Sequence, residues 1–251
     1  NNPLIKETAA LKDKKGRREQ GLFLVEGAKM ASECVKSGME IERAILSESY
    51  RGDCLFDTAV RVSDEVFRFL SDEKSPQGIL CAVKLPKDAL RPPKNSCLLL
   101  DGVSDPGNMG AIIRTAEAAG AHGVIIPKRR GVGLTATVAK TSAGAVEYMP
   151  VVRVPNIVST IEELKQKGLW IFCADMDGQP WCSTDMGGPI GIVVGAEGSG
   201  VSRLTKEHCD FVVSLPMNGQ VNSLNASVAA AIVIYEAVRQ RSGLPSFVKK
   251  N

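Results

Sequence analysis

Residues 97–120, CLLLDGVSDPGNMGAIIRTAEAAG, contain the transition that decides the fold. Residues 97–103 form an apolar run typical of a buried strand, and the DPG at 105–107 is a tight-turn sequence. Apolar residues then recur at helical spacing over residues 108–119, and Asn108 stands where an N-cap would lie. A buried strand that turns directly into a helix is the repeating unit of α/β proteins with mostly parallel sheets.

The same alternation extends along the whole chain. Short apolar runs bounded by turn residues predict strands, and segments with helical periodicity predict helices. In the first part we expect strands at 22–27, 41–46 and 78–85, and helices ending near 36 and spanning 63–71. In the second part we expect strands at 97–103, 124–127, 170–174, 190–195 and 211–216, and helices at 108–119 and 225–239.

A break falls between these two parts. The segment from Lys84 to Ser96 carries three of the 13 prolines and no sustained apolar period, which is typical of a linker. We therefore expect a domain at 1–85, a linker at 86–96 and a second domain at 97–251.

Composition narrows the function classes. The chain has no run of 18 uncharged apolar residues and no apolar leader, so we expect a soluble cytoplasmic protein without a membrane partner. The seven cysteines are scattered and never spaced as C-x-x-C, which disfavours a disulfide framework or a zinc ribbon. Two histidines are too few for a multi-histidine metal centre, so we expect no metal.

Arg114 lies about 200° around the predicted helix from Ile112, at 100° per residue, and so points away from the core. An ion pair with Glu117 on the helix surface would explain it. A phosphate- or substrate-binding role is the alternative; spacing alone favours the surface ion pair but leaves both open.

The loop GAEGSG, residues 195–200, directly follows an apolar strand. It lacks the Gly-Lys-Ser/Thr of a P-loop, and the sixth position counted from Gly198 is Arg203, so the dinucleotide pattern G-x-G-x-x-G is not met. A structural turn would account for the glycines. It would not account for Glu197, a charged residue held between them.

The final loop and helix form a third unusual region. Asn222, Ser223 and Asn225 cluster where the helix begins, although capping needs only one of them. The helix that follows is apolar on nearly every face. We therefore expect it to pack in the core or against a partner subunit.

Basic residues gather in two short clusters that could contact phosphate oxygens, although either could also be a solvated surface. Only 5% of residues are aromatic, so we expect any nucleic acid to be recognised through phosphates and shape rather than by broad base stacking. The candidate nucleic-acid-binding residues are Lys12, Lys14, Lys15, Arg17, Arg18, Lys128, Arg129 and Arg130.

Taken in order, D-G-V-x-D-P-x-N-x-G-x-I-x-R-T-A, V-G-A-E-G-x-G and S-L-N-A-S-V-A resemble the three motifs of the SpoU, or TrmH, family of RNA ribose methyltransferases, in the SPOUT superfamily. The resemblance covers residues 97–241, with Gly107 and Ala226 as small departures. It implies an α/β catalytic domain with a C-terminal trefoil knot. The first domain resembles the small α/β RNA-binding modules of ribosomal proteins.

The resemblance also implies an activity: methyl transfer from S-adenosylmethionine to a ribose 2′-hydroxyl of RNA, in a homodimer formed through the C-terminal domain. The two-domain layout resembles enzymes that act on large-subunit, 23S-type ribosomal RNA, with transfer RNA as the alternative substrate. The implied catalytic residues are Asn108, Arg114, Glu197, Ser223 and Asn225. The implied cofactor-binding residues are Ala174, Gly195, Leu215, Met217 and Leu224.

Arg114 is the family's catalytic residue, yet a guanidinium has a pKa above about 12 and stays protonated. We therefore expect Arg114 to clamp the phosphate next to the target ribose and to stabilise the developing alkoxide, with the other four catalytic residues fixing its position. Two further interpretations remain open from the sequence: a dinucleotide-dependent enzyme, and a non-catalytic RNA-binding or ribosome-assembly protein.

Overall fold

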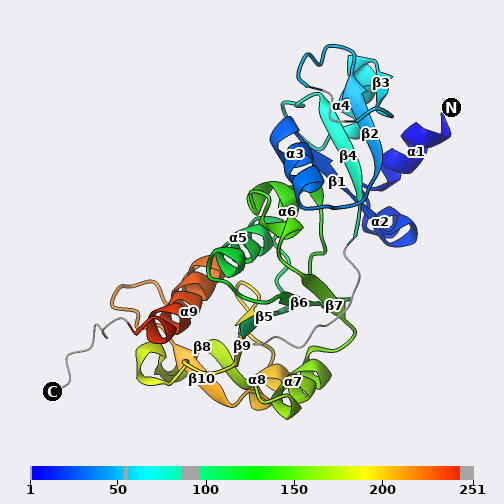
Figure 1. Ribbon diagram of the computed structural model, residues 1–251. Helices are drawn as coiled ribbons and strands as arrows, with labels where there is room; N and C mark the ends of the chain where they lie inside the picture. The colour runs from blue at the N-terminus through cyan, green and yellow to red at the C-terminus, as the bar shows by residue number, and fades with distance from the viewer. Residues whose placement is uncertain (1, 54–55, 86–95, 244–251) are drawn as a thin grey trace. The chain divides into compact units, whose positions relative to one another are not determined.

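A computed structural model describes residues 2–53, 56–85 and 96–243 (Figure 1). The chain forms two compact units: unit 1 comprises residues 1–86 and 133–148, and unit 2 comprises residues 87–132 and 149–251. Of the linker expected at 86–96, residues 86–95 lie outside the described residues, and Ser96 is the first residue of a buried strand rather than part of a linker. None of the described helices is long and apolar enough to cross a membrane.

Unit 1 is built around a mixed four-stranded sheet in the order β1-β4-β2-β3, in which β4 runs antiparallel to β1 and β2 while β3 runs parallel to β2. The strands are β1 (Leu22–Glu26), β2 (Ile41–Ser47), β3 (Val60–Val62) and β4 (Ile79–Lys84). The helices are α1 (Pro3–Ala10), α2 (Lys14–Gln20), α3 (Ala28–Lys36) and α4 (Asp64–Leu70). This unit has the small α/β fold expected for the first part of the chain.

The first twenty residues, which the sequence presents mainly as a basic segment, fold into α1 and α2. Leu11 between the two helices is 1% exposed, and Leu4 and Ile5 pack against the same core as β1 and α4. A Cβ on Gly16 would lie 2.0 Å from the carbonyl oxygen of Ala10, so the close approach of the two helices requires glycine there. The basic side chains therefore stand on packed helices.

Residues 133–148 belong to unit 1 by their contacts, although they follow the first motif in the chain. They form α6 (Ala136–Thr141) and the 3-10 helix η1 (Ala145–Glu147). The Cys34 thiol of α3 donates to Glu147 Oε1 at 3.4 Å, and the Tyr148 hydroxyl donates to Glu33 Oε2 at 2.6 Å. Polar contacts thus fasten this segment to α3.

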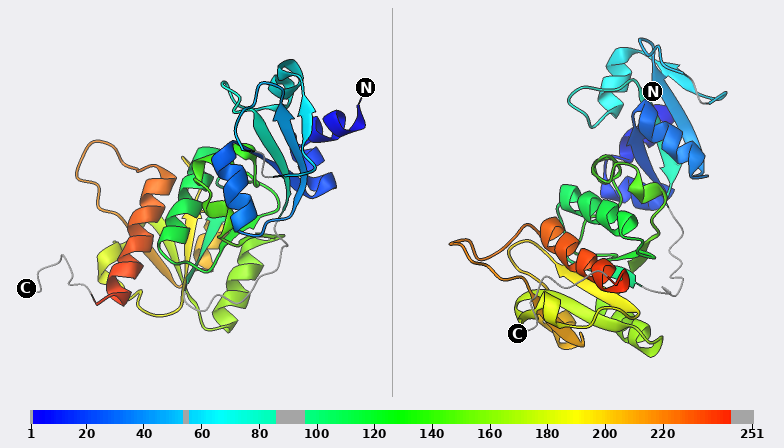
Figure 2. Two further views of the ribbon diagram at one scale, coloured as in Figure 1. Left: turned by 45° about the horizontal axis from the view of Figure 1, so that its top comes forward. Right: turned by 60° about the vertical axis from the view of Figure 1, so that its left-hand side comes forward.

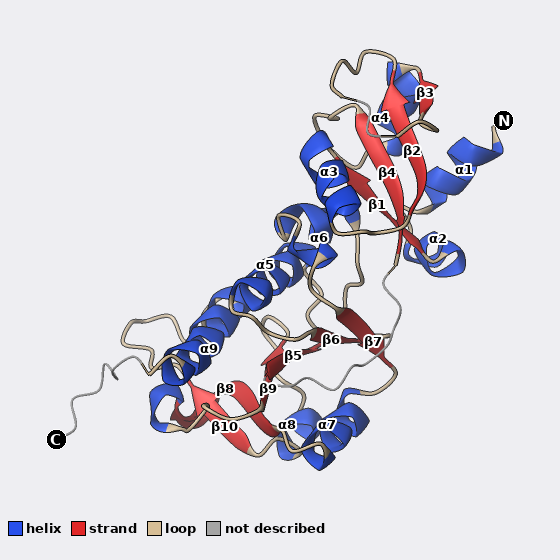
Figure 3. Cartoon of the chain, viewed as in Figure 1, coloured by secondary structure: helices blue, strands red, loops and turns tan. Residues whose placement is uncertain are grey.

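Unit 2 is a parallel six-stranded sheet in the order β10-β8-β9-β5-β6-β7 (Figure 3). Its strands are β5 (Ser96–Asp101), β6 (Val124–Pro127), β7 (Val151–Val154), β8 (Trp170–Pro180), β9 (Ile190–Gly195) and β10 (Phe211–Ser214). Its helices are α5 (Pro106–Ala118), α7 (Ile157–Gln166), α8 (Arg203–Glu207) and α9 (Ala226–Arg241), with the 3-10 helix η2 (Trp181–Ser183). The α/β class is as expected, and the trefoil knot stays a prediction from the resemblance.

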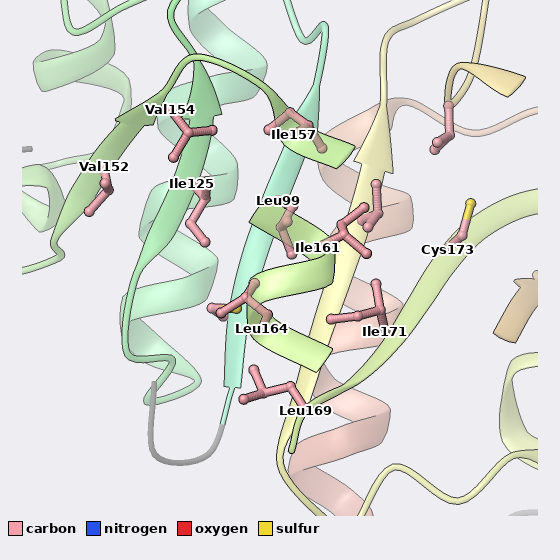
Figure 4. Close-up of a cluster of buried hydrophobic side chains, with 13 residues drawn as sticks. Leu99, Ile125, Val152, Val154, Ile157, Ile161, Leu164, Leu169, Ile171 and Cys173 are labelled. Carbon is pink, nitrogen blue, oxygen red and sulfur yellow. The ribbon is translucent and has the colours of Figure 1, made fainter. Parts of the chain in front are cut away.

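Helices cover both faces of the unit 2 sheet. Figure 4 shows Ile161 and Leu164 of α7 against Leu99 of β5 on one face, with further helices behind the sheet. α5 and α9 pack together on the other face (Figure 2). Leu98, Leu99 and Leu100 are each at most 1% exposed. Burial of both faces explains why these strands read as continuous apolar runs.

One expectation about α5 is wrong. The helix begins at Pro106 rather than Asn108, and its N-cap is Asp105, whose Oδ1 accepts a hydrogen bond from the Asn108 N–H at 2.7 Å. Proline is favoured in the first helical position because its ring fixes φ and it needs no N–H partner there. The side chain of Asn108 is therefore not used for capping.

The Glu147 carboxyl yields a pH prediction for unit 1. Burial raises its pKa to about 7, and the neighbouring charge of Glu33 adds a smaller contribution in the same direction. The hydrogen bond from Cys34 lowers the pKa but only partly offsets the effect of burial. The folded state therefore holds a proton that the unfolded state releases near pH 4.5, so the free energy of unfolding should fall as pH rises from about 4.5 to about 7. Glu147→Gln should flatten that slope in urea unfolding measured across this range. An unchanged slope would contradict the assignment.

Candidate functional site

The three sequence motifs meet at the carboxyl edge of the unit 2 sheet. β5 and β9 are adjacent and parallel, with Asp101 opposite Gly195, so the loops that follow both strands leave the sheet side by side. In open parallel sheets this edge is where ligands bind. Segments about ninety residues apart in sequence are thereby brought together.

A hydrogen-bonded cluster joins the three loops. Asn108 Nδ2 donates to Glu197 Oε1 at 2.5 Å, and Asn225 Nδ2 donates to the same oxygen at 2.9 Å. Asn225 Nδ2 also lies 2.8 Å from Asn108 Oδ1, to which it donates. Asn108 is 8% exposed, so its amide is held largely out of water. Three of the five candidate catalytic residues therefore form one polar unit.

Asn225 has two roles. Its Oδ1 caps α9 by accepting from the backbone N–H groups of Ser227 at 2.9 Å and Val228 at 3.4 Å. Its Nδ2 is directed to the cluster. The cap fixes the orientation of the amide, so the start of α9 and the Glu197 loop are positioned by the same side chain.

The glycines of residues 195–200 form the turn that presents Glu197. A Cβ on Gly195 would lie 2.1 Å from the carbonyl carbon of Gly200, and Gly198 and Gly200 have φ of 82° and 66°. Ala196 and Gly200 exchange backbone hydrogen bonds of 3.0 and 2.9 Å across this turn. The turn explains the glycines, and the two asparagine amides explain the charged residue between them.

Arg114 and Ser223 are exposed and take no part in this cluster. Arg114 makes no hydrogen bond or ion pair with any residue that the structure describes, so the surface pair with Glu117 does not form. Ser223 likewise has no hydrogen bond among the described residues. That the cluster fixes the position of Arg114 stays a prediction.

The candidate cofactor-binding residues border the same sheet edge. Gly195 ends β9, Leu215 follows β10, and Met217 and Leu224 expose apolar side chains, 36% and 41% exposed, in the loop before α9. In β8 the pairing with β10 skips residues 174–178, because Val212 pairs with Cys173 and Val213 pairs with Gln179. Ala174 is the first of the skipped residues.

The sequence does not reveal this irregularity or the ion pairs that hold it. Lys206 of α8 lies 3.3 Å from Asp175 and also pairs with Asp177, both in the residues that β8 omits from the pairing. The Lys206 hydrogen bond lowers the pKa of Asp177. No motif marks these residues, because the register of β8 depends on a strand that comes more than thirty residues later.

The basic residues divide into two that hydrogen-bond to backbone carbonyls within unit 1 and six whose side chains are exposed, of which Lys15 Nζ lies 3.8 Å from Glu19 Oε1. Lys12 Nζ donates to the carbonyl of Phe69 at 2.6 Å, and Arg17 Nη1 donates to the carbonyls of Leu11 at 2.8 Å and Lys12 at 2.5 Å. These two cations close helix ends and turns within unit 1. The side chains of the other six candidates are exposed: Lys14, Lys15, Arg18, Lys128, Arg129 and Arg130.

Removing Glu197 tests the cluster. Glu197→Ala leaves the buried amide of Asn108 without its acceptor, so we expect a loss of about 1–3 kcal/mol in the free energy of unfolding. Glu197→Gln retains an acceptor oxygen and should cost less than half as much. Denaturant unfolding of both variants gives the comparison, and equal losses would mean that the hydrogen bonds do not stabilise the loops.

Comparisons with known proteins bear on these loops. A family model described as the SpoU rRNA Methylase family matches residues 95–235, and one described as the MRM3-like substrate binding domain matches residues 2–81. The 23S rRNA (guanosine-2′-O-)-methyltransferase RlmB of Ralstonia nicotianae is 53% identical over 150 residues, 59% of this chain and 60% of that protein. The chain thus spans about 60% of the length of the curated relatives it matches.

Two solved structures are similar as well. The SpoU methyltransferase AviRb of Streptomyces viridochromogenes, in complex with the cofactor AdoMet, has a TM-score of 0.89 and 27% identity over 98% of this chain and 100% of that one. The TrmH/SpoU tRNA modifying enzyme of A. aeolicus has a TM-score of 0.54 and 30% identity over 60% of this chain and 77% of that one. With its three motifs joined at one sheet edge and more than half its length matched by the family model, the chain belongs to the SpoU rRNA methylase family.

Proposed function

We propose that this chain transfers the methyl group of S-adenosylmethionine to a ribose 2′-hydroxyl of RNA. The observation that carries the proposal is the hydrogen-bonded cluster of Asn108, Glu197 and Asn225, which joins the three family motifs. Helix α5, which contributes Asn108 to this cluster, also carries Arg114. RlmB and AviRb, the relatives named above, support the same reaction class.

The residues at the carboxyl edge fit such a cofactor. Exposed apolar side chains of Met217 and Leu224 offer surface for an adenine ring, and the strand ends at Ala174, Gly195 and Leu215 offer backbone groups for its polar edge. When bound, S-adenosylmethionine supplies a methyl group that is already an activated electrophile. The protein then needs to orient the ribose and manage the proton of its hydroxyl.

Arg114 is suited to orienting the ribose. Its guanidinium carries a permanent charge, and no side chain among the described residues engages it. We infer that it binds the phosphate beside the target ribose and stabilises negative charge on the 2′-oxygen. The hydroxyl proton would pass to solvent as the O–CH3 bond forms and the S–CH3 bond breaks, which leaves S-adenosylhomocysteine. The hydrogen-bonded cluster would hold the surrounding loops in place, with Ser223 contacting substrate from the last of them.

Ribosomal RNA of the large subunit is our proposed substrate. The AdoMet-bound rRNA methyltransferase from Sinorhizobium meliloti is similar over 95% of this chain and 95% of that one, with a TM-score of 0.82 and 25% identity. By contrast, the similarity to the tRNA modifying enzyme covers 60% of the chain. Within this proposal residues 1–85 hold RNA, residues 86–96 link the domains and residues 97–251 perform catalysis. Transfer RNA is the second candidate because the motifs are shared with that enzyme.

We further propose a homodimer formed through unit 2. Val228 and Tyr235 of α9 are 47% and 48% exposed and lie two turns apart on one side of the helix, an apolar surface that a second copy could cover. Such an RNA-modifying dimer would act in the cytoplasm.

Substituting Arg114 tests the activity. Arg114→Ala and Arg114→Lys should each lower the rate of methyl transfer at least about a hundredfold, the usual scale for losing a group that stabilises charge in the transition state. Titration calorimetry should show unchanged S-adenosylmethionine affinity. Lys167→Ala, which removes an exposed charge at the end of α7, is the control. Full activity of both Arg114 variants would refute its role, and binding of NAD in place of S-adenosylmethionine would refute the reaction.

Salt dependence tests the RNA-binding surface. Each lost phosphate contact should reduce the slope of log affinity against log salt by about 0.7–0.9. The double variant Lys15→Gln/Arg18→Gln should therefore bind ribosomal RNA more weakly with a shallower slope, while retaining its fold and cofactor affinity. An unchanged slope would remove α2 from the interface.

A further inference from the structure

Unit 1 contains a cavity of about 320 Å³ that no motif residue lines. Its walls come from the end of β2, the loop that follows, α4 and the turn before β4, including Ser49, Tyr50, Asp64, Arg68 and Gln77. Small-ligand sites occupy roughly 300–1,000 Å³, so this cavity could hold one nucleobase with part of its ribose.

The ring of Tyr50 packs against glycine backbone at this cavity. A Cβ on Gly78 would lie 3.0 Å from Tyr50 Cδ2, and a Cβ on Gly52 would lie 2.3 Å from the phenolic oxygen. The ring thus packs directly on two glycine backbones, and Gly78 has a φ of 78° that disfavours any larger residue. Arg61 Nη1 also donates to the Tyr50 carbonyl at 3.3 Å. An aromatic face packed in this way is a good stacking platform because little entropy is lost on binding.

Two charged side chains that line the cavity, Asp64 and Arg68, differ in their hydrogen bonding. Asp64 Oδ1 accepts hydrogen bonds from Ser49 Oγ at 2.7 Å and from the Ser49 N–H at 3.2 Å, and these bonds lower the pKa of the carboxyl. A carboxylate has about four lone-pair sites, so it retains capacity for a further N–H donor. Arg68, one turn further along α4, forms no hydrogen bond or close ion pair with a described residue and is exposed, but its charge also contributes to lowering the pKa of Asp64.

A carboxylate acceptor and an exposed guanidinium suit the two ends of a nucleotide. Base edges carry N–H donors that a carboxylate accepts, whereas a phosphate would be repelled by that carboxylate and attracted to the arginine. Proteins that read RNA sequence do so mainly through unpaired bases that stack on aromatic rings and bond along their edges. A free anion would use only part of this arrangement.

We propose that this cavity receives one unpaired nucleotide of the RNA substrate, with its base stacked on Tyr50, its edge bonded to Asp64 and its phosphate bound by Arg68. The ligand class rests on the proposed function. The cavity would let unit 1 select RNA by a single extruded nucleotide in addition to general phosphate contacts.

The test uses the full chain and five stem-loop RNAs: one fully paired in the stem, and four that carry a single bulged A, C, G or U. The wild-type protein should bind at least one bulged RNA about tenfold more tightly than the paired RNA. Tyr50→Ala and Arg68→Ala should lose that preference while binding paired RNA within about threefold of wild type. Asp64→Asn should change which bulged base is preferred.

Lys74→Ala is the matched control, since it removes an exposed charge from the same unit outside the cavity lining. This variant should weaken the binding of paired and of bulged RNAs by the same factor. Circular dichroism checks folding, and if Tyr50→Ala is unfolded the Arg68 and Asp64 variants decide the question.

Equal binding of bulged and paired RNAs by the wild-type protein, or full preference in the cavity variants, would overturn the proposal, as would tighter binding of inorganic phosphate than of RNA. S-adenosylmethionine binding and methyl transfer to ribosomal RNA are measured in parallel. If both are present without a bulge preference, only the cavity proposal fails; if both are absent, the proposed function fails.

Discussion

The hydrogen bonds that Glu197 accepts from Asn108 and Asn225 are the constraint on which the candidate site depends. They join three loops whose positions are set by a parallel sheet, in which every strand delivers its following loop to one edge. The Glu197 carboxylate is exposed and forms no ion pair among the described residues. The loops are therefore joined by neutral amide donors, and Arg114 of α5 is not used to join them.

Burial of both sheet faces determined which elements the sequence could predict. Strands β5, β6 and β9 are covered on both sides and read as uninterrupted apolar runs. β7 is a four-residue edge strand that contains Arg153, and α8 has five residues, so neither carries enough periodicity to be recognised. The start of α5 was misplaced because two capping side chains, Asp105 and Asn108, stand three residues apart and only packing shows which one caps.

The sequence marks individual site residues as unusual, but it does not show which of them form hydrogen bonds with one another. Glu197 stood out because glycines do not need a carboxylate between them, and Asn225 because one helix needs one cap. Their mutual hydrogen bonds depend on a register between β5 and β9 that no local pattern encodes. The irregularity of β8 and the cavity around Tyr50 depend similarly on residues that are distant in sequence.

The division into two units separates two kinds of binding energy. Phosphate contacts and an extruded nucleotide held by unit 1 are the same before and during methyl transfer, so they can strengthen RNA binding and selection without lowering the chemical barrier. A guanidinium at the reacting ribose engages charge that grows only as the 2′-oxygen loses its proton, so it can lower that barrier. Losses at unit 1 should therefore appear in KM and losses at Arg114 in kcat, because only the second interaction strengthens along the reaction.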